Sequence, residues 1–194
     1  FVYQSTATDL SGLFAQEPFT LHGVDAAAFD VDVNGNVFLK ENVVFTGSDD
    51  TYNFTVRAQD IHGNRSDQNV TLNIRDVSGP VFDPPGPNIS VSKPEKSDTF
   101  VYQVGVTDPS GVKPLWLEGD DADAFTIDAN GNVSLKETAV FTGSDDTYNF
   151  TVRAEDIHGN RSDQNVTLNI LDTTGPVFTP PGPVFIDLDE NSGP

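Results

Sequence analysis

Residues 45–74 read FTGSDDTYNFTVRAQDIHGNRSDQNVTLNI, and residues 141–170 repeat this stretch with a single change, Gln59 to Glu155. The two copies lie 96 residues apart, which is the size of one small domain. The chain of 194 residues is therefore predicted to hold two nearly identical tandem modules rather than one large fold. Such arrays favour reach, stiffness or avidity over catalysis, since a second copy of an active site seldom needs such close identity.

Within the repeated stretch, the alternation of apolar and polar residues predicts a β-strand. Tyr148, Phe150, Val152 and Ala154 occupy every second position, so they would share one face of a strand and point into a core. Six other segments of the second copy also read as short strands: 89–91, 100–107, 114–118, 125–127, 133–141 and 166–170. Asn130-Gly131 predicts a two-residue hairpin, because both central residues of such a turn favour positive φ. Seven short strands with nothing at helical spacing predict an all-β sandwich of about one hundred residues.

Two proline-rich segments, 76–87 and 172–183, read as short semi-rigid spacers between modules. The first copy lacks a counterpart of the opening strand at 89–91, and residues 184–191 read as an opening strand without the rest of its module. The sequence is thus expected to be an excerpt of an array. It would start just after the opening strand of one repeat and end just after the opening strand of another. We predict a first repeat over 1–79 that lacks its opening strand, a second over 83–175, and the opening strand of a third over 179–194.

This order of strands also predicts the partners of the chain. Neighbouring repeats of the same chain are the first. In addition, the first module would have a bare sheet edge while residues 184–191 would have no sheet of their own. We therefore expect head-to-tail strand exchange between fragments, in which one molecule adds its last strand to the first module of the next.

The composition excludes several classes of function. Thirty acidic against ten basic residues give a formal charge of −20, which would repel nucleic acid. An apolar content of 36% and clear strand periodicity argue against disorder, and no apolar run approaches the length of a membrane span. There is no cysteine, so disulfides and thiolate metal sites are excluded. No phosphate loop, serine elbow or His-Glu metal motif occurs, so we expect no catalytic residues.

Several phrases of the chain resemble the motifs of cadherin domains. Residues 125–133 (FTIDANGNV) resemble the family's F-x-I-D-x-x-T-G-x-I hairpin, and residues 148–156 (YNFTVRAED) its Y-x-L-x-V-x-A-x-D strand. Asp76 and Asp172 each precede a P-x-F segment and resemble the aspartates of the D-x-N-D-N-x-P-x-F linker. Shorter matches to the family's A-T-D and x-E-N segments are found at 7–9, 106–108 and 189–191. The resemblance covers most of each repeat and implies tandem seven-stranded Greek-key sandwiches.

The same family binds Ca²⁺ between successive modules, which stiffens the array, and the resemblance implies ligands here. The first junction would use Asp76, Asp108 and Asp156. Glu95 and Asp172 would serve the second junction and Glu190 the one after it, while Asp9 and Asp60 would face a preceding module.

The chain also departs from the family pattern. The D-R-E motif expected near Phe45 and Phe141 is absent, and each linker is two residues shorter and lacks the N-D-N core. Asp108 is followed by Pro109-Ser110 rather than by a second aspartate. Because Ca²⁺ takes six to eight oxygen ligands, we predict at most one ion per junction.

Near-identical cadherin-like repeats without cysteine are similar to the extender regions of giant surface adhesins of Gram-negative bacteria. This resemblance implies a non-enzymatic repeat, located extracellularly at the cell surface, that spaces and stiffens an adhesin.

A module that binds carbohydrate or protein is the alternative. The loops 12–23 and 111–119 differ in length between otherwise similar copies, and loops are where recognition diversifies. Trp116, the one tryptophan, either faces outward and stacks on a sugar, or lies in the core with its neighbours Leu115 and Leu117 outward. We expect the core orientation for Trp116, because Phe19, which is also apolar, lies in the corresponding segment of the first copy.

Overall fold

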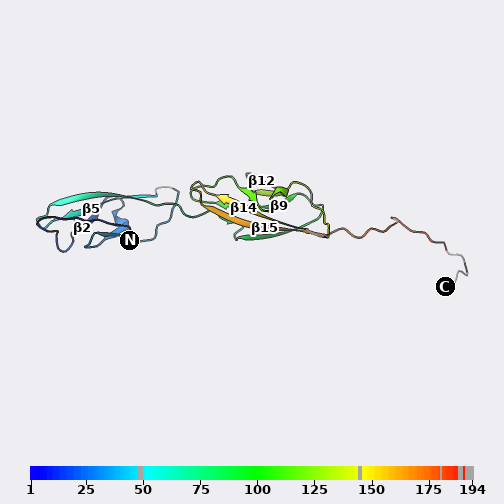
Figure 1. The fold of residues 1–194 in the computed structure, drawn as a ribbon, viewed down its shortest axis with the longest axis horizontal. Coiled ribbons are helices and arrows are strands. Elements are labelled where there is room, and N and C mark those ends of the chain that lie inside the picture. The colour runs from blue at the N-terminus through cyan, green and yellow to red at the C-terminus, as the bar shows by residue number, and fades with distance from the viewer. Residues whose placement is uncertain (48–49, 144–145, 180, 188–189, 191–194) are drawn as a thin grey trace. The chain divides into compact units, whose positions relative to one another are not determined.

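A computed structural model describes residues 1–47, 50–143, 146–179, 181–187 and 190 (Figure 1). These residues form β-strands and two single-turn 3-10 helices, with no α-helix among them. Contacts divide the chain into two compact units. The first holds Phe1–Asp83, Val106–Pro114 and Ala154–Ser162, and the second holds Pro84–Gly105, Leu115–Arg153 and Asp163–Pro194. None of the described helices is both long and apolar enough to cross a membrane.

Two three-stranded sheets form the first unit. One sheet has the order β1-β4-β3 (Tyr3–Gln4, Asn36–Leu39 and Phe29–Val31), and the other has the order β2-β5-β6 (Phe19–His22, Thr51–Gln59 and Arg65–Asn73). All neighbouring strands in both sheets are antiparallel. A 3-10 turn, η1 (Ala26–Ala28), leads into β3. The core lies between the two sheets, where the rings of Phe29 and Phe54 pack with centroids 4.4 Å apart.

The second unit repeats this plan and adds a strand. One sheet has the order β12-β13-β9 (Phe125–Ile127, Asn132–Leu135 and Phe100–Gln103), and the other has the order β11-β14-β15-β8 (Trp116–Glu118, Thr147–Glu155, Arg161–Leu171 and Asn88–Pro94). A second 3-10 turn, η2 (Ala122–Ala124), precedes β12. The added strand β8 runs parallel to β15. The rings of Phe125 and Phe150, 4.2 Å apart, reproduce the packing of the first core.

The predicted alternation is confirmed in β14, where Phe150, Val152 and Ala154 are buried and the residues between them are not. The strand predicted over 100–107 is divided at Val104: β9 pairs with β13, whereas β10 (Gly105–Thr107) pairs with β7 (Val81–Asp83). With β9 and β10 counted as one strand, the second sandwich has the seven predicted strands. The strand predicted over 133–141 is shorter and ends at Leu135.

A hairpin forms at Asn130-Gly131, but it is not the predicted two-residue turn, because Ile127 pairs with Val133 and residues 128–132 lie between them. Only Gly131 has a positive φ, of 78°, and Asn130 does not. The turn is fixed instead by Asp128, whose Oδ1 accepts hydrogen bonds from the backbone nitrogens of Asn130 (2.8 Å) and Asn132 (2.9 Å). A Cβ at Gly131 would lie 1.9 Å from the backbone oxygen of Val104, so only glycine fits there.

The first unit has no described strand in the place of β8, so the outer edge of β6 carries no described partner. Residues 184–187, which the sequence predicts as part of an opening strand, form no strand and are exposed. The rest of that predicted strand includes positions 188, 189 and 191, which lie outside the described residues. A single strand cannot satisfy its backbone groups or bury a face without a sheet, which accounts for the absence of strand at 184–187.

Candidate metal centre

Three of the predicted ligands meet in the first unit. Asp76, Asp108 and Asp156 each place one carboxylate oxygen within 4.8 Å of the other two. Asp76 follows β6 in the first spacer, Asp108 follows β10, and Asp156 follows β14. Three segments that are distant in sequence thus bring three acidic groups to one point.

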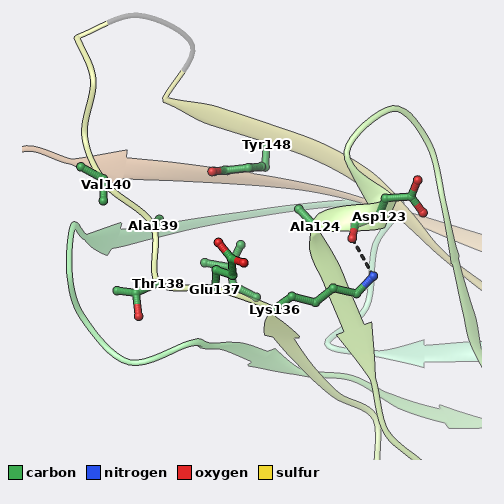
Figure 2. A pocket seen from close by; sticks show the side chains of 9 residues that line it. Asp123, Ala124, Lys136, Glu137, Thr138, Ala139, Val140 and Tyr148 are labelled. Atoms are coloured by element: carbon green, nitrogen blue, oxygen red, sulfur yellow. Dashed lines mark hydrogen bonds between the residues drawn. The ribbon is translucent and has the colours of Figure 1, made fainter.

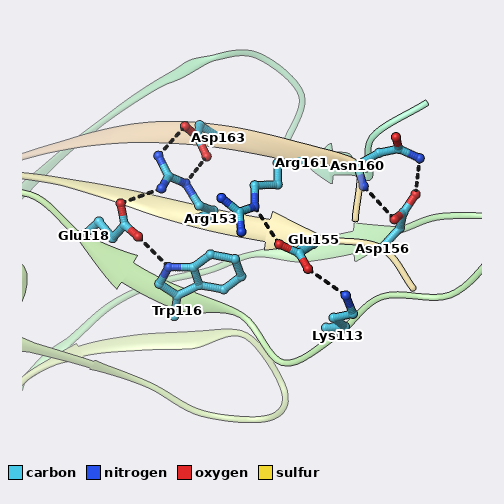
Figure 3. Close-up of polar contacts among 9 residues, drawn as sticks. All are labelled: Lys113, Trp116, Glu118, Arg153, Glu155, Asp156, Asn160, Arg161 and Asp163. Atoms are coloured by element: carbon cyan, nitrogen blue, oxygen red, sulfur yellow. Dashed lines mark hydrogen bonds and ion pairs between the residues drawn. The ribbon is translucent and has the colours of Figure 1, made fainter. Parts of the chain in front are cut away.

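Asp156 is held by a clamp of local hydrogen bonds, drawn in Figure 3. Its Oδ1 accepts the backbone N–H of Asn160 at 2.8 Å, and its Oδ2 accepts the side-chain Nδ2–H of the same residue at 2.7 Å. The side chain is fully buried. Burial raises the pKa of Asp156, but the hydrogen bonds from Asn160, Gly159 and His158 outweigh it, so the net pKa lies below the ordinary value. The carboxylate is therefore ionised at neutral pH.

The same clamp occurs at four turns and has a sequence signal that the analysis above missed. The pattern Asp-x-x-Gly-Asn begins at Asp32, Asp60, Asp128 and Asp156. In each turn the Asn donates its backbone N–H to one carboxylate oxygen and its side-chain Nδ2–H to the other. The pattern itself therefore builds a turn, and only the one at Asp156 has two further carboxylates beside it among the described residues.

The other two carboxylates are positioned by serines two residues on. Asp108 Oδ1 accepts the backbone N–H of Ser110 at 2.8 Å and its hydroxyl at 2.6 Å. Asp76 Oδ1 accepts the backbone N–H of Ser78 at 3.1 Å. The second oxygen of Asp76 is buried and has no hydrogen-bond partner among the described residues. A buried carboxylate oxygen without a donor is costly, and a cation beside this atom would offset that cost.

The backbone of the first spacer packs tightly against the start of β15 at Gly79. A Cβ at Gly79 would lie 2.6 Å from both the backbone oxygen of Arg161 and the hydroxyl of Ser162. Nearby in the same unit, the rings of Phe45 and His158 meet edge to face with centroids 5.5 Å apart. His158 is thus a turn residue packed on an aromatic ring.

The three carboxylates are of the ligand type that a hard cation prefers, and their small number limits how many ions can bind. Carboxylate oxygens are ligands that Ca²⁺ prefers, and it takes six to eight of them. Asp156 and Asp108 already accept local hydrogen bonds, so three carboxylates would supply only part of one coordination shell. Backbone oxygens and water would have to supply the rest. The residues therefore fit one ion rather than several.

The remaining predicted ligands are not brought into a group of three among the described residues. Asp9 and Asp60 line one pocket in the first unit, of about 190 Å³. Asp9 carries the same serine turn as Asp108, with Ser11 N at 2.7 Å from its Oδ1, and Asp60 carries the same clamp as Asp156. Asp9 and Asp60 therefore repeat the arrangement of Asp108 and Asp156. No third carboxylate joins them in a group of three among the described residues.

Glu95 and Asp172 are linked through one hydroxyl. Thr174 Oγ1 lies 2.7 Å from Glu95 Oε1 and 3.3 Å from Asp172 Oδ1. Glu95 is buried, and the hydrogen bond from the Thr174 hydroxyl, aided by Lys96 and by the backbone N–H groups of Thr173 and Phe141, lowers its pKa to about 2 despite desolvation. Glu190 is exposed and makes no described contact with any of these groups.

A hollow of about 440 Å³ lies in the second unit between β13, η2 and β14 (Figure 2). Its polar lining residues are Asp123, Lys136, Glu137, Thr138 and Tyr148. Lys136 Nζ donates to the backbone oxygen of Asp123 at 2.7 Å.

The prediction that Trp116 lies in the core, with its neighbouring leucines outward, is wrong. Leu117 lies opposite the fully buried Val152, so Leu117 faces the core and Trp116 faces outward beside Arg153. The indole Nε1–H donates to Glu118 at 2.8 Å, and Arg153 bridges Glu118 and Asp163 (Figure 3). Phe19, which suggested a core orientation for this segment, is itself 7% exposed and belongs to the first core.

Pairing registers also show that Phe19 is not the counterpart of Trp116. Thr20 lies opposite Arg57, as Trp116 lies opposite Arg153. Thr20 therefore occupies the place of the tryptophan in the first unit. This correspondence is hidden in the sequence, because the loops before the two strands differ in length.

No protein-family model matches the chain. Protocadherin Fat 2 of Rattus norvegicus and of Mus musculus are each 29% identical to it over 164 residues, which is 81% of this chain and 4% of the relative. The chain thus spans a small part of the length of these curated relatives.

Among solved structures, Drosophila N-cadherin EC1-4 superposes with a TM-score of 0.53 at 20% identity, covering 79% of this chain and 41% of that chain. Human Protocadherin-24 EC1-2 superposes with a TM-score of 0.51 at 20% identity, covering 88% of each chain. The chain thus has a cadherin-like fold. This likeness concerns the fold, and it confirms the predicted all-β tandem sandwiches of cadherin-like type.

Proposed function

We propose that these cadherin-like repeats are non-enzymatic structural modules that space and stiffen an extracellular adhesin, with one Ca²⁺ ion at the junction after the first repeat. The observation that carries the proposal is the meeting of Asp76, Asp108 and Asp156, together with the buried, unpartnered Oδ2 of Asp76. The near-identity of the two copies supports a role in spacing, because a spacer needs number and regularity rather than diversity.

The chain's own residues would hold the ion in a defined way. Asp156 and Asp108 are already fixed by Asn160 and Ser110, so they would bind with little rearrangement. Asp76 belongs to the spacer and would tie that segment to the two turns of the second repeat. The ion supplies positive charge that offsets the mutual repulsion of the three carboxylates. The spacer would lose freedom of movement as a result.

Calorimetric titration with Ca²⁺ tests the site. We expect about one ion per chain, and loss of this binding in Asp76→Asn. Asp172→Asn is the matched control, because Asp172 holds the same place in the second spacer but has no group of three around it among the described residues. Equal binding by all three proteins would contradict the site.

Small-angle scattering and thermal unfolding test the stiffening. Calcium at 100 times its dissociation constant should add about 2.7 kcal/mol to the free energy of unfolding of the part that binds it. The distribution of interatomic distances should also narrow relative to that in chelator. If the maximum dimension and the melting temperature are the same in calcium and in chelator, the proposed role of Ca²⁺ is wrong.

We further propose repeat boundaries at 1–79, 83–175 and 179–194, and a parent protein that is a bacterial surface adhesin. The absence of cysteine and the near-identical copies support this origin. The sequence of the parent on both sides provides the test. Further copies of the repeat and a secretion signal are expected, whereas a short array of divergent repeats followed by a membrane helix would contradict it.

A binding role is the second candidate, and the outward Trp116 beside Arg153 and Glu118 favours it. An aromatic ring with charged neighbours can stack on a sugar and hydrogen-bond its hydroxyls. Glycan-array binding that is lost in Trp116→Thr, which copies Thr20 of the first unit, would support this role. Identical arrays for the two proteins would exclude Trp116 from any such site.

A further inference from the structure

The outer face of the four-stranded sheet in the second unit carries a block of uncharged polar side chains, which we call the polar ladder. Three hydrogen bonds of 3.0–3.3 Å cross between β14 and β15, each from a threonine hydroxyl to an asparagine oxygen. In a chain with a formal charge of −20, such an uncharged surface is distinct. The ladder consists of Thr147, Asn149 and Thr151 on β14, Asn165, Thr167 and Asn169 on β15, and Asn88, Ser90 and Ser92 on β8.

The first unit repeats the part of the ladder that lies on the two long strands. Three hydrogen bonds of 2.9–3.2 Å cross between β5 and β6 with the same pairing of threonine hydroxyl and asparagine oxygen. The residues concerned are Thr51, Asn53, Thr55, Asn69, Thr71 and Asn73. The ladder is therefore a feature of both copies.

The edge beside the ladder is where the two copies differ. In the second unit the alternate positions of this edge are Trp116, Glu118 and Asp120. The matching positions of the first unit, 96 residues earlier, hold Thr, His and Val, whereas the leucine and the glycine between them are the same in both copies. A constant surface bordered by a varied edge is the pattern expected where the edge selects a ligand.

A hollow of about 280 Å³ lies where the ladder meets this edge. Asn149 Oδ1 accepts the hydroxyl of Thr167 at 3.0 Å, and the Nδ2–H groups of Asn149 have no acceptor among the described residues. Asp120 is exposed and adds a carboxylate. Amides, hydroxyls and a carboxylate together offer the donors and acceptors that bind sugar hydroxyls. The polar residues lining the hollow are Asp120, Asn149, Thr151, Asn165 and Thr167.

Trp116 stands next to this hollow on the same face. Trp116 lies opposite Arg153, two residues along β14 from Thr151, so the indole is about 7 Å along the strands from the lining of the hollow. Its Nε1–H donates to Glu118 at 2.8 Å, which holds the ring in place (Figure 3). An aromatic platform beside a polar hollow suits a sugar ring, which has an apolar face and a polar rim.

We propose that this face of the second unit binds a neutral polysaccharide, with one sugar on Trp116 and the next in the hollow on the ladder. The inference rests on the binding role given above as the second candidate function, and it names the class of ligand and the further contacts. The ladder provides hydrogen bonds that any hydroxylated polymer can use, and the edge residues select among sugars. The calcium site takes no part in it.

Charge selects a neutral ligand over a charged one. An anionic polysaccharide would be repelled by the acidic chain and by the carboxylate of Asp120. A cationic polymer would be attracted to the whole acidic surface, and that attraction would weaken as salt screens it. A neutral polymer gains nothing from the charges and needs the uncharged donors and acceptors of the ladder. Its binding should therefore be the same at about 0.1 M and about 1 M salt.

Affinity electrophoresis of the full chain tests the site, in gels that contain a β-glucan, a mannan, a galactan or a xylan. At least one of these neutral polysaccharides should slow the natural chain. Asp120→Val, which copies Val24 of the first unit, should weaken binding at least about tenfold, because a charged acceptor is lost. Thr167→Val keeps the shape and removes one hydroxyl, so it should weaken binding about three- to tenfold.

Thr71→Val is the matched control, since it makes the same change in the ladder of the first unit, beside an edge without the tryptophan. It should leave binding unchanged, and equal losses in Thr71→Val and Thr167→Val would overturn the assignment to the second unit. If Trp116→Thr abolishes binding while Asp120→Val and Thr167→Val do not weaken it, the binding role stands and the ladder site is wrong. No retardation by any of the four polysaccharides, or retardation that disappears at about 1 M salt, would overturn both.

Discussion

Strands β6 and β15 form a controlled comparison inside one molecule. Each is the last strand of its sandwich, and each pairs with a preceding long strand of nearly identical sequence. Among the described strands, β15 has a neighbour on its other edge and β6 has none. The apolar residues of β15 are buried and those of β6 are half-buried. The sequence of a strand therefore does not by itself determine how deeply its side chains are buried. The strand that pairs with its other edge also contributes.

The largest expected effect comes from removing the same leucine in both strands. Leu168→Ala should cost about 2–5 kcal/mol, because Leu168 is fully buried and a cavity remains. Leu72→Ala should cost about 1 kcal/mol, since Leu72 is only half-buried. Urea unfolding followed by the fluorescence of Trp116 reports on the second unit, and circular dichroism reports on both. Equal costs at low protein concentration would show that the edge of β6 is covered after all.

A smaller effect should follow from the paired glutamines. Gln164→Ala leaves the carbonyls of Pro84 and Gly86 without their donor and should cost about 1–3 kcal/mol. Gln68→Ala should cost less, because Gln68 is exposed and makes one described bond, with Ser5. Chemical unfolding of both variants under the same conditions measures the difference. A larger loss of unfolding free energy for Gln68→Ala than for Gln164→Ala would contradict this difference between the two strands.

The two spacers can be compared through one glycine each. Gly79→Ala would press a Cβ against Arg161 and Ser162 and should cost about 1–2 kcal/mol while weakening Ca²⁺ binding. Gly175→Ala, at the matching position, meets no atom within 4 Å and should be close to neutral. Thermal unfolding and calcium titration of both variants measure the difference in stability and in Ca²⁺ binding between the two spacers. Identical results would mean that the first spacer is not held at Gly79.

The smallest expected effect concerns pH and the buried Glu95, which has no described counterpart in the first unit. The pKa of its carboxyl is lowered from its ordinary value of 4.5 to about 2, chiefly by the hydrogen bond from the Thr174 hydroxyl. A depressed folded-state pKa stabilises the second unit fully above about pH 4.5, and this contribution is lost as the pH falls toward about 2. Glu95→Gln in chelator should therefore be less stable than the natural chain at pH 7 and equal to it near pH 2. A gap that does not narrow with acid would contradict this linkage.

Much of the fold was predictable from local patterns. The alternation in β14 and the offset of the repeat determine the sandwich and its duplication, because both are periodic signals. The division of the 100–107 strand at Val104 was not predictable, since it depends on β7 arriving to pair with β10. The Asn130-Gly131 turn was placed correctly but explained wrongly, because the capping role of Asp128 competes with the positive-φ rule.

The candidate site was predictable in part. Resemblance to the cadherin pattern named Asp76, Asp108 and Asp156 together, and the structure brings them together. It could not show that Asp76 has a buried oxygen without a partner, because that depends on tertiary packing. The orientation of Trp116 was also beyond the sequence, since a leucine on each side allows either face to be inward.

The identity of β6 and β15 also creates a hazard during synthesis. The ribosome completes β6 first, and β8 begins 15 residues after β6 ends, long before β15 exists. A nascent β8 therefore emerges beside an open edge that matches its true partner in sequence. The prolines of the spacer restrict the backbone and supply a restraint until β10 has been made and pairs with β7. Faithful assembly of such an array depends on its spacers as much as on its sandwiches.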